Sequence, residues 1–250
     1  MIISVLLFAG LRERAAASRL RIELEDGATV KDALEQLDHS GPLEGLMRAL
    51  SIQIAVNREY ATRETVLSAE DELALIPPVS GGAHPAREYE GEPGEGALEP
   101  RLADGEELVS SETEAQLPGK VHVRISAQPL RLDPLLQIVG DDRAGAIVAF
   151  QGVTREVSSL QYEAYVEMAE PQIEAIARRC LQANDAFAAA VEHRIGIVPL
   201  RHPSVLVVVS AAHRQQAFGA ASQIIDEVKA MAPIWKREIR GDSAAAWMHD

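Results

Sequence analysis

The chain of 250 residues is poor in cysteine, in aromatic residues and in long apolar runs. Its single cysteine, Cys180, excludes an intramolecular disulfide and a metal site built from several thiolates. No stretch approaches the roughly 20 apolar residues needed to cross a bilayer. The apolar start, residues 1–8, has no basic segment of the kind that opens a signal peptide. We therefore expect a cytoplasmic protein with no membrane segment.

Positive charge is also scarce, and the formal net charge is −14. A nucleic-acid-binding protein normally carries a basic surplus, so we expect no nucleic-acid partner. Residues 83–119 hold ten acidic and two basic residues, among many glycines and prolines. Such a segment buries too little apolar surface to offset the entropy of ordering it. The sequence predicts a disordered acidic linker over 83–119 between two domains, residues 1–82 and 120–250.

The first domain shows the pattern of a small mixed sheet with one helix. Apolar runs and apolar–polar alternation predict strands at 2–8, 19–25, 52–56 and 73–76. Thr29 is placed to cap a helix whose apolar face begins at Val30. The order of two strands, a helix and two strands is that of a β-grasp, or ubiquitin-like, fold. Its last strand runs through Pro77-Pro78 into Gly81-Gly82.

The second domain is predicted to be α+β. Strands are expected at 121–126, 145–152, 160–166, 191–198, 205–210 and 234–239, and helices at 170–183 and 214–231. Cys180 falls on the apolar stripe of the first helix, so we expect it to pack in the core. We expect Phe218 to face inward on the second helix, and Trp235 to serve packing rather than chemistry.

Cationic side chains gather at the predicted ends of elements in the second domain, where they could form a positive pocket. One pair stands where a buried strand meets a helix, whose N-terminus offers free N–H groups and a positive dipole end to an anion. The candidates are Arg155, His213, Arg214, Lys229, Lys236 and Arg237. More ordinary roles stay open, because a lysine at a helix C-terminus often only complements the dipole. The pair Glu192-His193 has no second ligand at a useful spacing, so no metal site is expected.

The Gly81-Gly82 pair also has two interpretations. It could simply begin a flexible linker. Alternatively, because glycine has no Cβ, an extended tail could enter a channel too narrow for other residues.

Several segments resemble molybdopterin synthase. The run DELALIPPVSGG at 71–82, the opening VLLFAGLRE at 5–13 and Val56-Asn57 resemble its small, sulfur-carrier subunit across residues 1–82. Four segments resemble its large, catalytic subunit across roughly 121–250. They are FQGVTR at 150–155, VEHRIG at 191–196, SAAHR at 210–214 and KAMAPIWKRE at 229–238. The chain thus resembles a fusion of the two subunits.

The resemblance implies a reaction. In that family a partner enzyme adenylates the terminal glycine of the carrier, which becomes a thiocarboxylate. The catalytic subunit uses the sulfur to turn a cyclic pyranopterin monophosphate into the dithiolene molybdopterin, with no tightly bound cofactor. Lys229 would be the central group, as general acid or transient nucleophile, because neighbouring cations disfavour its charged form. Lys236 would stabilise negative charge. The substrate-binding residues would be Arg155, His213, Arg214, Arg237 and Glu238, together with Val153 and Thr154 through their backbones.

The chain departs from the family at the carrier terminus. Ala83 follows Gly82, so the carboxyl group needed for adenylation is locked in a peptide bond. We therefore expect cleavage after Gly82, in a segment of the kind that proteases favour. We also expect a homodimer through the second domain, so that a site could include residues of the other chain. An alternative is a sulfur-carrier or interaction protein whose second domain binds a pterin without catalysis.

Overall fold

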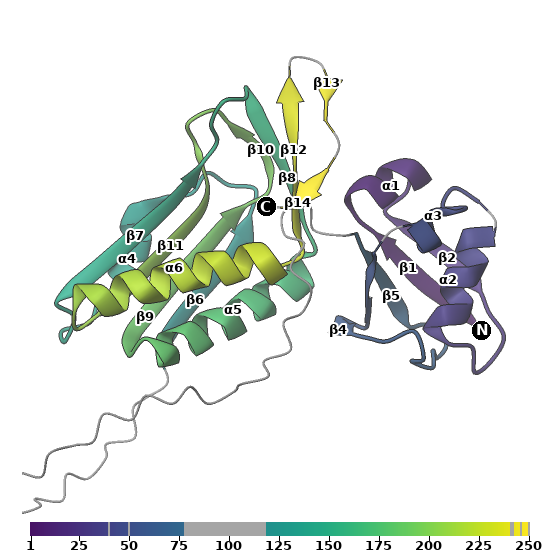
Figure 1. Ribbon diagram of the computed structural model, residues 1–250, viewed down its shortest axis with the longest axis horizontal. Helices are drawn as coiled ribbons and strands as arrows, with labels where there is room; N and C mark the ends of the chain where they lie inside the picture. The colour runs from purple at the N-terminus through teal and green to yellow at the C-terminus, as the bar shows by residue number, and fades with distance from the viewer. Residues whose placement is uncertain (40, 50, 78–118, 241–242, 246, 250) are drawn as a thin grey trace, which may run out of the picture.

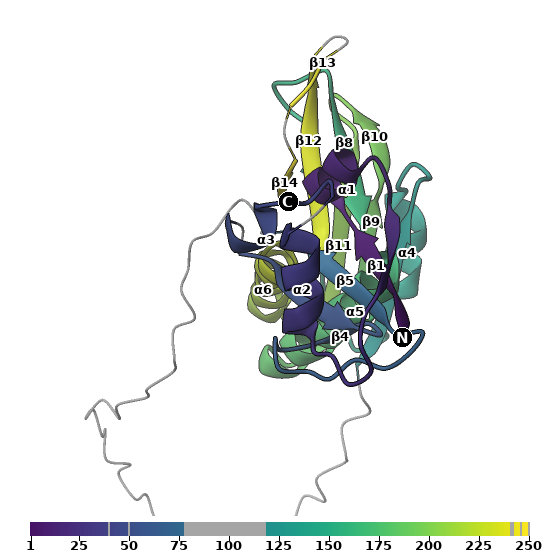
Figure 2. The same cartoon turned by 90° about the vertical axis from the view of Figure 1, so that its right-hand side faces the viewer.

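The computed structural model describes residues 1–39, 41–49, 51–77, 119–240, 243–245 and 247–249. These residues form an N-terminal domain (1–77) and a C-terminal domain (119–249) that lie against each other (Figures 1 and 2). The linker expected at 83–119 lies outside the described residues, except for Gly119. Among the described helices, none is long and apolar enough to span a membrane.

The N-terminal domain has the expected β-grasp fold. Its elements are β1 (Ile2–Leu7), α1 (Ala9–Ala15), β2 (Arg19–Glu23), α2 (Val30–His39), α3 (Leu46–Ala49), β3 (Gln53–Val56), β4 (Glu59–Tyr60) and β5 (Glu72–Ile76). The strands form one sheet in the order β2-β1-β5-β3-β4, in which only β1 and β5 run parallel. The predicted cap is confirmed, because the Asp32 N–H donates to Thr29 Oγ1 at 3.4 Å and the Thr29 N–H donates in return to Asp32 Oδ2 at 2.7 Å. The apolar face of α2 covers the sheet.

The C-terminal domain is α+β and holds two sheets. Its elements are β6 (Lys120–Ser126), α4 (Leu132–Ile138), β7 (Ala146–Val153), β8 (Ser159–Ala164), α5 (Val166–Ala183), β9 (Ala186–Arg194), β10 (Gly196–Pro199), β11 (Pro203–Ala211), α6 (Arg214–Met231), β12 (Ile234–Arg240), β13 (Ser243–Ala244) and β14 (Met248–His249). One sheet has the order β6-β9-β11-β7, and its two faces are covered by α5 with α6 and by α4. The other has the order β10-β8-β12-β13, with β14 also on β12. Figure 1 shows β8 and β12 on the side of the N-terminal domain.

Three expectations about elements were wrong. The single strand expected at 191–198 is two strands in different sheets, because Gly196 adopts a left-handed φ of 80° that redirects the chain. Helix α5 begins at Val166 instead of residue 170, since the Tyr165 carbonyl already accepts the N–H groups of the first turn. Phe218 is 62% exposed instead of buried, because it lies one residue off the buried stripe of α6.

The expected core positions of Cys180 and Trp235 are confirmed. Cys180 is completely buried in the main core of the C-terminal domain, where burial raises the pKa of its thiol to about 11. A thiol held in the protonated form is a poor nucleophile, so the only cysteine of this chain packs rather than reacts. Trp235 is 1% exposed and belongs to a cluster that spans both domains.

Candidate functional site

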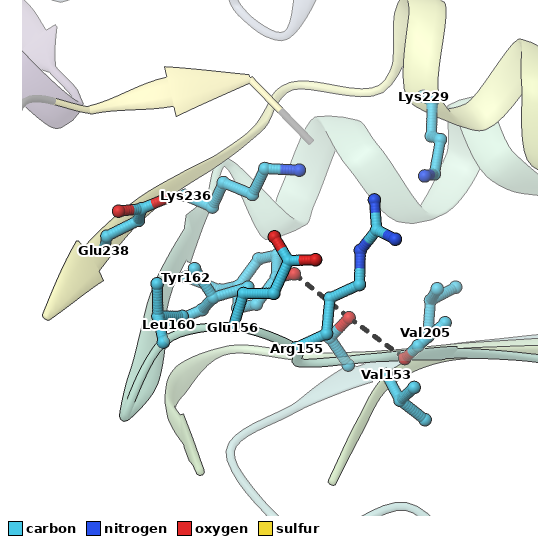
Figure 3. Close-up of a pocket in the computed structure, with 12 residues that line it drawn as sticks. Val153, Arg155, Glu156, Leu160, Tyr162, Val205, Lys229, Lys236 and Glu238 are labelled. Atoms are coloured by element: carbon cyan, nitrogen blue, oxygen red, sulfur yellow. Dashed lines mark hydrogen bonds between the residues drawn. The ribbon is translucent and has the colours of Figure 1, made fainter. Parts of the chain in front are cut away.

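A cavity of about 380 Å³ lies where the two sheets of the C-terminal domain meet α6. Three of the predicted cations line it, each from a different element: Arg155 after β7, Lys229 near the end of α6, and Lys236 on β12. Figure 3 shows the ends of these three side chains pointing toward one another. Within the part of the chain that the structure describes, neither Arg155 nor Lys229 forms an ion pair, so both are available to an anionic ligand.

Two carboxylates and two hydroxyls complete the polar lining. Glu156 and Glu238 line the cavity beside the cations. The Tyr162 hydroxyl donates to Ser204 Oγ at 3.0 Å, and the Ser204 hydroxyl in turn donates to the Gly152 carbonyl at 3.3 Å (Figure 3). These two hydrogen bonds connect β8 and β11 to the end of β7, just before Arg155. They therefore fix the wall from which the arginine reaches the cavity.

The backbone around Arg155 is shaped by close packing. A Cβ atom at Gly152 would lie 2.6 Å from Val205 Cγ1, so only glycine lets β7 approach β11 there. Glu156 follows with a left-handed φ of 65°, which is costly for a residue with a side chain. The turn that follows Arg155 is therefore held by the surrounding structure at a cost in backbone strain.

Two expected binding residues near Arg155 differ in their positions. Val153 lines the cavity and is half exposed. Thr154 does not line it: its side chain is buried, its N–H donates to the His202 carbonyl and its own carbonyl accepts from Arg201. The backbone of Thr154 thus holds the loop before β11, and the expected phosphate contact at that backbone does not match this arrangement.

His213 and Arg214 do not line the cavity formed by this chain. His213 precedes the first turn of α6, where its backbone N–H donates to Gln216 Oε1 at 3.0 Å. Lys229 lies in the last turn of the same helix. Arg214 and Lys229 are fifteen positions apart on α6, which corresponds to a rise of about 22 Å. His213 and Arg214 therefore do not meet Lys229 within one chain, because they lie at the opposite end of α6.

Arg237 also faces away from the cavity. Neighbouring residues of a strand point to opposite faces, so Lys236 and Glu238 face the cavity while Trp235 and Arg237 face the N-terminal domain. Arg237 donates to Gln161 Oε1 at 2.7 and 2.9 Å and pairs with Glu13 of the N-terminal domain. The expected role of Arg237 in substrate binding thus does not match its contacts, which lie at the boundary between the domains.

That boundary has an apolar centre. Phe8 lies 5.3 Å from Trp235 and 4.8 Å from Tyr165 between ring centroids. Ala55, Ala74 and Ile76 of the N-terminal domain join the same buried cluster. The Trp235 Nε1–H group donates to the Pro77 carbonyl at 3.4 Å. The last described residue of the N-terminal domain is therefore held against the strand that carries Lys236.

Charged and polar groups surround the apolar centre. Arg12 pairs with Glu163 at 2.8 Å, and Glu163 also accepts the Ala9 N–H. Burial raises the pKa of the Glu163 carboxyl, although the Arg12 guanidinium partly opposes this. The Tyr165 hydroxyl donates to Glu72 at 3.1 Å, and burial together with this carboxylate raises the pKa of Tyr165 to about 12.

Sequence reasoning missed some cavity residues and all of the interdomain contacts. Leu160 and Tyr162 line the cavity from one face of β8, and the alternation of that strand was the signal that could have identified them. Glu156 could have been noted as the neighbour of Arg155. The pair Glu192-His193 is not a ligand pair, because Glu192 accepts two hydrogen bonds from Arg124, at 2.7 and 2.8 Å, and lies 3.0 Å from His122.

Comparisons with known proteins agree with this division of the chain. Residues 5–82 match the ThiS family and residues 125–231 match the MoaE protein family. The molybdopterin synthase catalytic subunit of Bos taurus is 39% identical over 140 residues, which cover 54% of this chain and 74% of that protein. That of Thermoplasma volcanium is 41% identical over 132 residues, covering 50% and 96%.

A solved structure gives a further comparison. The crystal structure of molybdopterin synthase from Staphylococcus aureus is 30% identical, covers 50% of this chain and 96% of its own, and has a TM-score of 0.48. The identities of the two catalytic subunits, over most of their own length, show the family. The chain belongs to the family of molybdopterin synthase catalytic subunits, with a ThiS-family sulfur-carrier domain fused before the catalytic domain.

Proposed function

We propose that this enzyme converts a cyclic pyranopterin monophosphate to molybdopterin, taking two sulfurs from a thiocarboxylate at Gly82. The observation that carries the proposal is the arrangement about β12. One face of this strand lines the cationic cavity. On its other face, Trp235 binds the carbonyl of Pro77, the residue after which the tail 78–82 of the N-terminal domain begins. The sulfur donor and its acceptor site thus share one strand.

The length of the tail supports delivery to the cavity. The Pro77 carbonyl is held by the indole of Trp235, on the face of β12 opposite Lys236. Five residues, 78–82, follow Pro77 and span about 17 Å when extended. A tail that starts beside β12 therefore needs to pass only around that strand to bring its last carboxyl group to Lys236 and Lys229.

The lining suggests a role for each cation. Arg155 can bind the phosphate of the substrate with its planar guanidinium, and Lys236 can stabilise the negative charge of the thiocarboxylate. Lys229 then gives a proton to the departing oxygen or forms a transient bond to the substrate. Each sulfur replaces one carbon-bound oxygen and the carrier returns as a carboxylate. Each product therefore consumes two thiocarboxylates, and no tightly bound cofactor is required.

A thiocarboxylate at Gly82 requires the bond to Ala83 to be cut, so the active form consists of two fragments that associate through the interdomain contacts during each sulfur transfer. An adenylating and sulfur-transferring enzyme must then act on the released terminus. The mass of the N-terminal fragment, measured on protein purified from its own host, tests this. The expected mass ends at Gly82 and carries sulfur in place of one oxygen. A single uncut chain with full activity would refute the cleavage.

We also propose that the enzyme is a homodimer through β7. This strand ends the order β6-β9-β11-β7, and its outward residues Ile147 and Val153 are 45% and 51% exposed. Its start pairs with Ala211, two residues before His213, while its end precedes Arg155. Antiparallel pairing of β7 with its copy about a two-fold axis would place the start of one β7 beside the end of the other. His213 and Arg214 would then reach the cavity of the second chain.

A further inference from the structure

Near the end of the chain, β13 and β14 both pair with β12. Strand β14 pairs with β12, with His249 opposite Trp235 and Met248 opposite Lys236. The residue just before β14 is Trp247, which packs against the interdomain apolar cluster. Figure 2 shows β14 beside β12.

Trp247 contacts one guanidinium from each domain. The Cζ atom of Arg237 lies 4.6 Å from the centroid of the indole ring, and that of Arg12 lies 5.9 Å from it. Both distances are within the range in which a cation is attracted to the face of an aromatic ring. A single side chain of the C-terminal domain therefore holds cations of both domains.

The same two arginines form the charge pairs that cross the boundary. Arg12 of the N-terminal domain pairs with Glu163 at 2.8 Å, whereas Arg237 of the C-terminal domain pairs with Glu13. The crossings run in opposite directions, and the indole lies near the guanidinium of each pair. Trp247 therefore helps to position both arginines for their partners, although the Arg12 and Glu13 side chains stay 37% and 46% exposed.

We propose that residues 243–245 and 247–249 form a latch that keeps the N-terminal domain on its own catalytic domain, and that Trp247 is its contact residue. The latch has a consequence that rests on the proposed function. Each product consumes two thiocarboxylates, yet the chain carries one sulfur-carrier domain for each catalytic domain. The spent N-terminal fragment must leave, so the latch sets the rate of its exchange.

The experiment uses the full chain with a protease site introduced after Gly82, which is then cut while both fragments remain. The dissociation rate of the N-terminal fragment is measured by native mass spectrometry after dilution. We expect Trp247→Leu, which keeps apolar bulk without an aromatic face, to speed dissociation about tenfold, and Trp247→Phe to stay within about threefold. Phe218→Leu, an aromatic-to-leucine change on the exposed face of α6, serves as the matched control and leaves the rate unchanged.

A double-mutant cycle and hydrogen exchange identify the contact. If the ring holds Arg12, Trp247→Leu and Arg12→Gln together cost less than the sum of their separate effects. Hydrogen exchange in the uncut chain then rises at 8–13 and 159–165 but not in α5 or β9. An unchanged dissociation rate in Trp247→Leu overturns the latch, and so does faster exchange throughout the C-terminal domain. Neither readout involves a pterin, so a failure of the proposed reaction would leave this result standing.

Discussion

Trp235 and Lys236 are adjacent on β12 and serve opposite sides of it. The indole of Trp235 stacks on Phe8 and binds the Pro77 carbonyl, whereas the side chain of Lys236 lines the cationic cavity. One strand is therefore both the docking surface for the N-terminal domain and a wall of the candidate active site. A small rotation or shift of this strand would change both at once, which couples docking to the cavity.

Replacing Lys229 distinguishes an enzyme from a carrier with a passive pterin-binding partner. Lys229→Ala should reduce the thiolation of the pterin by roughly 10²–10⁴-fold, since the variant lacks the proposed acid or nucleophile. Lys229 is exposed, so the free energy of unfolding should change by less than about 0.5 kcal/mol. Lys31→Ala, on the exposed face of α2, is the matched control. Full activity of Lys229→Ala would favour the carrier interpretation.

Mixing two inactive variants tests whether His213 and Arg214 act across a dimer. A Lys229→Ala chain and an Arg214→Ala chain are co-expressed, so that about half of the dimers contain one of each. If the partner subunit's Arg214 completes the site, each mixed dimer holds one intact site, and roughly a quarter of the wild-type activity returns. If both residues act within one chain, every site stays defective and no activity returns. Activity is assayed together with the oligomeric state.

The buried carboxyl of Glu163 predicts that docking weakens as the pH rises. Burial raises its pKa above the ordinary 4.5, with Arg12 and Arg237 opposing and Glu13 adding to the shift. The protonated form is therefore favoured in the docked state. Its contribution is fully present below about pH 4.5 and is lost as the pH rises through the raised pKa. Dissociation of the cleaved N-terminal fragment should speed up over that interval, and Glu163→Gln should flatten the profile.

A matched variant checks the source of this pH dependence. Glu174→Gln removes an exposed carboxylate that pairs with Arg178 within α5, and it should leave the profile unchanged. Dissociation that slows with rising pH in the wild-type chain would contradict the assignment to Glu163.

The strained backbone at Glu156 predicts a gain in stability on substitution. Asparagine tolerates a left-handed φ better than glutamate, so Glu156→Asn should raise the free energy of unfolding by about 1 kcal/mol. Glu156→Ala removes the same carboxylate but keeps the strained backbone. The difference in the free energy of unfolding between the Asn and Ala variants therefore isolates the backbone effect. Denaturant unfolding of the two variants measures the difference. Equal stability would show that φ at this position costs little.

Local sequence patterns determined most of the elements and the residue types of the site. Helix α6 has the predicted bounds because its apolar stripe and its Pro233 stop are local signals. The alternation of β12 is equally local, and by itself it assigns Lys236 and Arg237 to opposite faces of the strand. The motifs around Arg155, Lys229 and Lys236 named the three cations that line the cavity.

Only the tertiary structure decided which of those residues meet. The alternation of side chains along a strand predicts that Lys236 and Arg237 face opposite sides. It does not predict that a cavity lies on one side and residues 8–13 on the other. Contacts such as Trp235 with Pro77, or Arg237 with Glu13, join residues more than 150 positions apart, and they arise from packing two domains rather than from any local preference. The predicted helix 214–231 already separates Arg214 from Lys229, but the sequence could not show which end of α6 meets the cavity, because that depends on how the helix packs against the two sheets.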